Sequence, residues 1–243
     1  MMFTHYRTQG FIFKKTDRGE ADRIFTIFAK DFGKLDLLAK AERKIKSKLR
    51  AGLEVFYLSE IEFIQGKTHK TLTDAILIDN FKNLRSNLKK LATAYKISET
   101  LNDLVKGQEP DKKIWQLLQE TFDKLDNPRI LAAKYQILYH YFIWNLLLIL
   151  GYELEVYNCV LCGKKITPKD IFFSPKEGGL LCSECGKTTK SVKEIDQSIV
   201  KIIRLFIKKD WSTLNRLKTE PEDLRQISVI SKCYLSQILE QTR

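Results

Sequence analysis

The chain has 243 residues, of which 44% are hydrophobic, so it can bury a sizeable core and its length favours two domains. Lys and Arg number 42 against 30 acidic residues, and the formal net charge of +12 favours negatively charged partners such as polyanions. Charge alone leaves open a basic surface that has no partner.

The composition also argues against export and membrane insertion. The opening residues MMFTHYRTQGFIFKK lack the apolar run of a secretory signal. The most apolar stretch, residues 137–150, is shorter than the roughly 20 residues that a membrane-spanning helix needs. It also contains His140 and Asn145, so we expect a buried helix. The expected protein is cytoplasmic, associated with the nucleoid, and has no membrane partner.

Residues 6–79 predict five β-strands, because β-branched and aromatic residues dominate short runs that end at turn residues. The expected strands are residues 6–15, 22–29, 34–39, 55–64 and 70–78. The third connection, residues 40–52, is long and packs six basic residues together. Five short strands with a long insertion after the third favour a barrel of the OB type. Periodicity does not separate this fold from an SH3-like barrel.

Apolar residues take helical spacing after Asn80, which predicts a helical domain. The first helix contains Leu84 to Val105, and later helices are expected at residues 111–125, 129–150, 192–209 and 222–241, with Gly151 as a C-cap. The predicted fold class is therefore α+β. It has an N-terminal five-stranded OB-fold barrel (residues 1–79), then an all-α domain (80–243) with a zinc module at 158–187.

Four of the five cysteines form two CxxC pairs that predict a metal site. The pairs are Cys159 with Cys162 and Cys182 with Cys185, and 19 residues separate them, a spacing typical of tetrahedral zinc. A glycine follows each pair, and we expect it to release the turn. Four thiolates leave no open coordination position, so the predicted Zn²⁺ is structural. The alternatives are a redox dithiol and a cysteine set that no longer binds metal.

Basic residues gather in the loops of the expected barrel, where OB folds frame nucleic acid. Phe11, Phe13, Phe25, Phe28 and Tyr57 offer ring faces for bases, although most of these rings are expected in the core. The turn at residues 66–70 adds further positive charge. The expected DNA contacts are Arg18, Arg23, Lys34, Lys40, Arg43, Lys44, Lys46, Lys48 and Arg50.

No motif predicts catalysis. The two GKT triplets lack the first glycine of a phosphate-binding loop, because Ile61 and Leu181 stand at that position. The three histidines form no triad pattern, and the acidic residues are spread among lysines. We therefore expect a protein that is not an enzyme.

Several segments resemble the bacterial RecO recombination-mediator family, and the resemblance covers nearly the whole chain. They are YRTQGFIF (6–13), GEADRIFTIF (19–28), FGKL (32–35) with the basic run after it, and LLILGY (147–152) leading into CVLCG and CSECG. The resemblance implies an OB-fold DNA-binding domain (residues 1–79), a helical domain with a zinc motif, and binding to single- and double-stranded DNA. It also implies annealing of complementary strands coated by single-stranded-DNA-binding protein. Together with RecR, the protein would help RecA to load onto that coated DNA.

Two other classes of function compete with this hypothesis. An RNA-binding zinc protein of translation or transcription can also combine a barrel with a zinc knuckle, and comparing affinity for matched DNA and RNA separates the two. A zinc-stabilised nuclease would cleave DNA in a divalent-metal-dependent reaction.

Overall fold

The computed structural model describes residues 4–66 and 68–241, and the chain divides into two compact units, Met1–Arg129 and Ile130–Arg243. The described part of the first unit holds a β-barrel and three α-helices. That of the second holds four α-helices and a small β-rich module, which contains one further short helix. No helix in the described part of the chain is long and apolar enough to cross a membrane.

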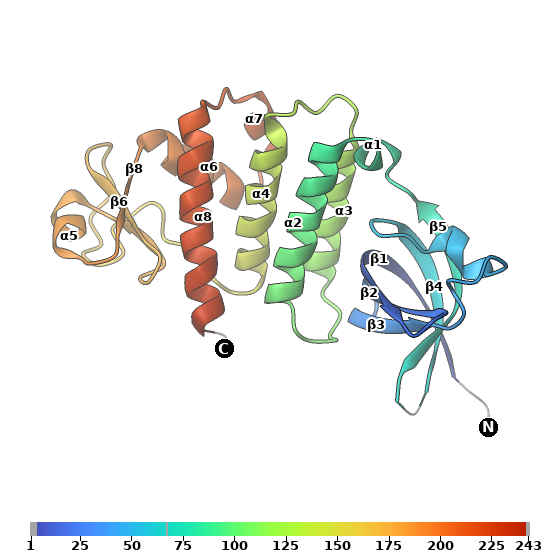
Figure 1. Ribbon diagram of the computed structural model, residues 1–243. Coiled ribbons are helices and arrows are strands. Elements are labelled where there is room, and N and C mark those ends of the chain that lie inside the picture. Colours follow the sequence, from blue (N-terminus) through green and yellow to red (C-terminus); the bar gives the residue numbers. More distant parts are fainter. Residues whose placement is uncertain (1–3, 67, 242–243) are drawn as a thin grey trace. The chain divides into compact units, whose positions relative to one another are not determined.

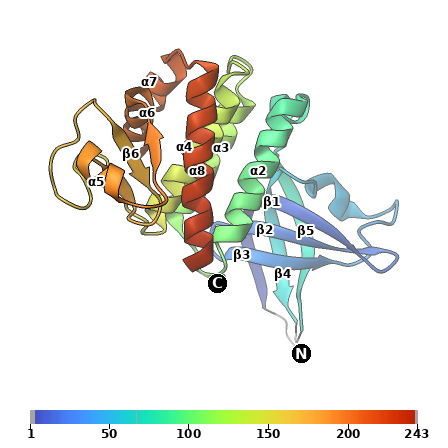
Figure 2. The same ribbon diagram turned by 60° about the vertical axis from the view of Figure 1, so that its left-hand side comes forward.

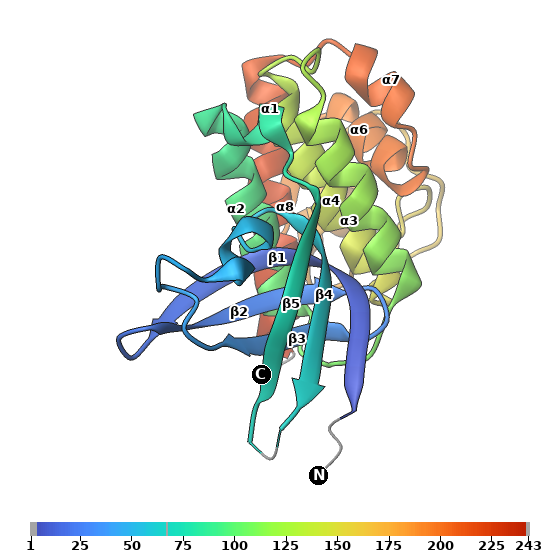
Figure 3. The ribbon, with the colours of Figure 1, turned by 90° about the vertical axis from the view of Figure 1, so that its right-hand side faces the viewer.

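A closed five-stranded barrel forms the start of the first unit (Figure 3). Its strands are β1 (His5–Arg18), β2 (Asp22–Ala29), β3 (Gly33–Ala39), β4 (Leu58–Gln65) and β5 (Lys70–Asp79). Their order around the barrel is β1-β2-β3-β5-β4, and β1 also pairs with β4. The β3–β5 pair is parallel, whereas the other neighbours are antiparallel. This is the OB-fold arrangement, which confirms the predicted fold and excludes the SH3-like alternative.

Side-chain alternation explains the barrel core. Alternate residues of β2 and β3 point inward and are fully buried, and β1 contributes Ile12 to the same core. The opposite face of β1 is buried as well, because the first unit's helices cover it. There the ring of Phe11 lies 5.0 Å from that of Trp115 and 5.4 Å from that of Phe122. The apolar character of β1 on both faces therefore has two different causes.

The first unit's helices are α1 (Lys82–Arg85), α2 (Leu88–Leu104) and α3 (Lys112–Asp126). Asn87 and Asp111 are the N-caps of α2 and α3, and each side-chain oxygen accepts two backbone N–H hydrogen bonds. A short 3₁₀ helix, η1 (Lys48–Gly52), ends the long connection between β3 and β4.

The second unit is built on helices α4 (Lys134–Ile149), α6 (Gln197–Ile207), α7 (Trp211–Arg216) and α8 (Pro221–Gln241). Helix α4 packs against α6 and α8 (Figures 1 and 2). The β-rich module contains β6 (Ile171–Ser174), β7 (Gly179–Leu181), α5 (Ser183–Thr188) and β8 (Lys193–Ile195), with β6 in the middle of its sheet. Gly151 follows α4 with a φ of 91°, and Tyr152 N–H donates to Leu147 O, so the expected C-cap is confirmed.

Four expected boundaries were wrong. The helix expected at residues 192–209 begins only at Gln197, because residues 193–195 form β8. The helix expected to contain Leu84 to Val105 is divided into α1 and α2 at residues 86–87. β4 begins at Leu58 and not at residue 55, because Phe56 has a φ of 64° in a turn closed by Tyr57 N–H on Glu54 O. Helix α4 begins at Lys134 and not at residue 129, since turns occupy residues 128–133. The elements β6, β7, β8, α5 and α7 were not predicted; each has six residues or fewer, too few for periodicity to be visible.

Candidate nucleic-acid interface and metal centre

The four cysteines of the CxxC pairs come together in the second unit. Their sulfur atoms all lie within 4.8 Å of one another, and Cys162 Sγ is 3.7 Å from Cys182 Sγ. With zinc–sulfur bonds of about 2.3 Å, a regular tetrahedron places sulfurs about 3.8 Å apart. The cluster therefore has both the donors and the spacing that a tetrahedral metal ion requires. It is the only such group of His, Cys, Asp and Glu side chains found across residues 4–66 and 68–241.

The first pair lies on a tight hairpin. Cys159 N–H donates to Lys164 O, and Gly163 N–H donates to Cys159 O. Gly163 has a φ of 71°, a conformation that glycine adopts without strain. The expectation that this glycine releases the turn is confirmed.

The second pair lies at the start of α5. Cys182 is its N-cap residue, and Gly186 N–H donates to Cys182 O within the first turn. Gly186 is helical and does not release a turn, so that expectation was wrong. A Cβ atom at Gly186 would overlap the ring of Phe172 on β6, and close packing is therefore what this position requires.

Backbone donors favour one thiolate in the cluster. Burial by itself would raise the pKa of Cys159, but N–H groups of Cys182, Cys162 and Leu161 bond to its sulfur and lower that pKa to about 6. Burial and the neighbouring sulfurs raise the pKa of Cys185 to about 12. One thiolate therefore makes ionisation of its neighbours harder, and a divalent cation would favour the thiolate form of all four cysteines. Cys233 on α8 is half-buried and lies outside the cluster.

The predicted DNA contacts fall on the barrel, but they do not form one uniform set. Lys40, Lys44, Lys46, Lys48 and Arg50 are exposed on the β3–β4 connection. Among the residues that the structure describes, their side chains have no hydrogen-bond or ion-pair partner. Arg18 is exposed at the end of β1, where Nη2 lies 3.0 Å from His69 Nε2. Lys67, in the adjacent turn, lies outside the described residues.

Arg23 and Arg43 are held by acidic partners. Arg23 Nε donates to Asp17 Oδ1 at 2.7 Å, and its Nη1 donates to Glu42 Oε2 at 3.0 Å. Arg43 Nη1 is 3.6 Å from Asp17 Oδ2 and remains partly exposed. The hydrogen bond from Arg23 holds the pKa of Asp17 below its ordinary value.

Glu42 is only 2% exposed, and this changes the electrostatics of the loop. In the sequence it is the single acid among six bases, and it would weaken their field if it pointed outward. Because it is buried against Arg23, every exposed charge of residues 40–50 is positive. The sequence did not reveal this burial, since the partner lies on another strand.

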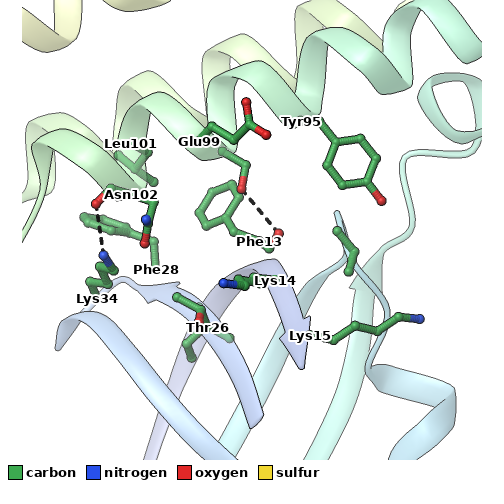
Figure 4. A pocket seen from close by; sticks show the side chains of 13 residues that line it. Phe13, Lys14, Lys15, Thr26, Phe28, Lys34, Tyr95, Glu99, Leu101 and Asn102 are labelled. Carbon is green, nitrogen blue, oxygen red and sulfur yellow. Dashed lines mark hydrogen bonds between the residues drawn. The ribbon is translucent and has the colours of Figure 1, made fainter. Parts of the chain in front are cut away.

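Lys34 has a structural contact. Its Nζ donates to Asn102 O and Val105 O at the C-terminal end of α2, and burial lowers its pKa. It lines a cavity of about 440 Å³ between the barrel and α2 (Figure 4). Among the described residues around this cavity Glu99 is the only acid, so the cavity lacks the paired carboxylates of metal-dependent nucleases.

The aromatic residues of the barrel are mostly buried, as expected. Phe11, Phe13, Phe25 and Phe28 belong to the core. Tyr57 is half-buried, and the guanidinium of Arg85 lies 4.8 Å from its ring centroid.

Comparison with known proteins finds a matching family model for each half of the chain. Residues 1–81 match the family model described as Recombination protein O N terminal, and residues 85–243 match Recombination protein O C terminal. The DNA repair protein RecO of Dehalococcoides mccartyi strain 195 is 32% identical over 236 residues, which are 97% of this chain and 91% of that protein. The DNA repair protein RecO of Acetivibrio thermocellus is 29% identical over 241 residues, or 98% of this chain and 93% of that protein.

Proposed function

The chain belongs to the RecO family of DNA repair proteins, and on that premise we propose that it binds DNA through the β3–β4 loop of its barrel and anneals complementary strands. In this proposal it binds both single- and double-stranded DNA. It works with RecR to help RecA load onto DNA coated by single-stranded-DNA-binding protein, and it makes or breaks no covalent bond.

The observation that carries the proposal is the loop's uniform charge. The exposed charged side chains of residues 40–50 are all lysines and arginines, and five of these have no described side-chain partner that would compete with a phosphate. Phosphate contacts of this kind give strong binding with little sequence preference, and they release counterions. Arg18 and Arg43 extend the surface, whereas Arg23 and Lys34 add positive charge from positions that protein contacts hold.

Annealing follows from the same electrostatics. Two complementary strands repel each other through their phosphates, and a surface that neutralises both lowers that barrier to pairing. The protein needs no nucleotide and no acid–base group for this step. Its contribution is to bind and concentrate two polyanions.

We further propose that the cysteine cluster holds Zn²⁺. All four donors are sulfur, so the ion would have no open position and would cross-link the hairpin at Cys159 to the start of α5. Its role is to stabilise the module. We also retain the proposal that residues 1–79 form the DNA-binding domain.

The experiment that tests the function is an annealing assay without nucleotide. Complementary DNA strands are precoated with single-stranded-DNA-binding protein of the same organism, and duplex formation is followed with and without the chain. Faster annealing at low salt that declines steeply with added salt supports the proposal. Tight DNA binding with no acceleration would overturn the annealing role, and preference for matched RNA would overturn the DNA assignment.

A further inference from the structure

Ile45 is an apolar side chain placed at the tip of the basic loop. It is 92% exposed, the largest exposed fraction among the large hydrophobic residues that the structure describes. Arg43, Lys44 and Lys46 surround it in the sequence. Burial of apolar surface is favourable, so an isoleucine at such a position contributes nothing to folding and is available to a ligand.

Two consecutive turns present this side chain. Lys44 N–H donates to Ala41 O, and Ser47 N–H donates to Lys44 O. Ile45 therefore follows the first residue of the turn at residues 44–47, and its side chain is exposed there.

Both ends of the loop are anchored. At one end Ala41 N–H donates to Asp22 Oδ1, and Glu42 is buried against Arg23. At the other end Leu49 packs on the barrel core, and Gly52 lies so close to the backbone of Ala75 that a Cβ atom would overlap it. These contacts hold the two ends of the loop on the barrel and leave Ile45 exposed at the tip between them.

We propose that Ile45 is a wedge that inserts between adjacent bases of DNA while the neighbouring cations hold the phosphates. The inference rests on the proposed binding of DNA by this loop. The outside of DNA is phosphate and sugar, so the base stack offers the apolar surface that an isoleucine can bury. Apolar residues flanked by basic ones unstack base steps in this manner in proteins that bend DNA.

The surroundings favour DNA over a protein partner. A specific protein interface needs an apolar patch of many residues, whereas Ile45 is a single side chain amid positive charge. Uniform positive charge suits a polyanion, and unstacking exposes bases for pairing, which is what an annealing protein requires. The wedge therefore gives the loop a role beyond electrostatic attraction.

The test uses the full chain, a DNA duplex with one 2-aminopurine, and the same labelled strand alone. The fluorescence of 2-aminopurine rises when the base leaves the stack. We compare the unmodified chain with Ile45→Ser and with the matched control Leu88→Ser, which changes a side chain that is 85% exposed at the start of α2. Binding is measured separately by fluorescence anisotropy on a DNA end label, so that each spectrum is recorded at saturation.

We expect the unmodified chain and Leu88→Ser to raise the 2-aminopurine signal at least about twofold, and Ile45→Ser to lose most of that rise while it still saturates the DNA. An equal rise for Ile45→Ser would overturn the wedge while DNA binding stands. Absence of any rise with the unmodified chain at saturation would do the same. Failure of the unmodified chain to bind DNA would instead overturn the proposed function, and the wedge with it.

Discussion

Tyr234 on α8 stacks on Trp144 of α4, with ring centroids 5.4 Å apart and 16° between the ring planes. Phe173 of β6 stands edge-on to both rings, at 6.3 Å from Trp144 and 5.8 Å from Tyr234. Trp144 Nε1 also donates to Ser231 Oγ at 2.9 Å. This aromatic cluster joins the cysteine module to helices α4 and α8. A structural change in the module should therefore alter the packing around the Trp144 ring.

Removal of the metal is expected to loosen this cluster. A chelator should release about one Zn²⁺ per chain, change the near-ultraviolet circular dichroism, and lower the Tm by at least roughly 5 °C. Cys182→Ser should reproduce the change, because it removes one of four ligands. Cys233→Ser is the control, since this thiol lies outside the cluster. Metal content by mass spectrometry checks the prediction, which fails if Cys182→Ser keeps full zinc or Cys233→Ser loses it.

The phenol of Tyr234 should ionise at a higher pH than an exposed tyrosine does. Burial raises its pKa from 10.0 to about 12, so the fold favours the neutral phenol. The corresponding stability is present below pH 10 and is lost as the pH rises from about 10 to about 12. Tyr234→Phe keeps the ring stack and cannot ionise. We expect equal stability of the two proteins near pH 7 and greater stability of Tyr234→Phe near pH 11; equal denaturation midpoints at both pH values would contradict the shift.

The barrel and the metal cluster could be predicted because their signals are local. Strands β1 to β5 have alternating or β-rich sequences of seven residues or more, and two CxxC pairs indicate a common site whatever the fold between them. The three-residue strands β7 and β8 are too short to show a periodicity, and only their pairing with β6 identifies them.

The loop illustrates what sequence patterns miss. Ile45 and Leu49 are both apolar and four residues apart, which suggests one buried helical face, yet Ile45 is exposed and Leu49 packs on the core. The difference arises because the chain makes turns at residues 41–47 and becomes a 3₁₀ helix only at Lys48. The burial of Glu42 likewise depends on Arg23, which lies on β2.

Neutralising three loop lysines together should weaken DNA binding and reduce its salt dependence. If Lys44→Gln, Lys46→Gln and Lys48→Gln each remove one phosphate contact, the slope of log K against log salt falls by up to about 3 for duplex DNA. Tm and zinc content should stay unchanged, because these side chains have no described partner. The matched control is a second triple variant, which removes the same amount of charge from exposed positions on α1, α2 and α3: Lys82→Gln, Lys89→Gln and Lys113→Gln. An unaltered affinity of the loop variant would place the DNA site elsewhere.

The buried pair of Arg23 and Glu42 should support both stability and the loop. Glu42→Ala removes the buried partner of Arg23, which is partly exposed and keeps its bond to Asp17, and the loss of this charged hydrogen bond should cost about 1.5 to 3 kcal/mol in unfolding free energy. Asp17→Asn removes the exposed partner of the same arginine and should cost less than Glu42→Ala does, because solvent screens the exposed pair. Because Glu42 anchors the loop, its replacement should also weaken DNA binding, although it removes a negative charge. Urea denaturation and anisotropy titrations check both effects. If Glu42→Ala instead binds DNA more tightly at unchanged stability, the glutamate acts through its charge alone and the anchoring role is wrong.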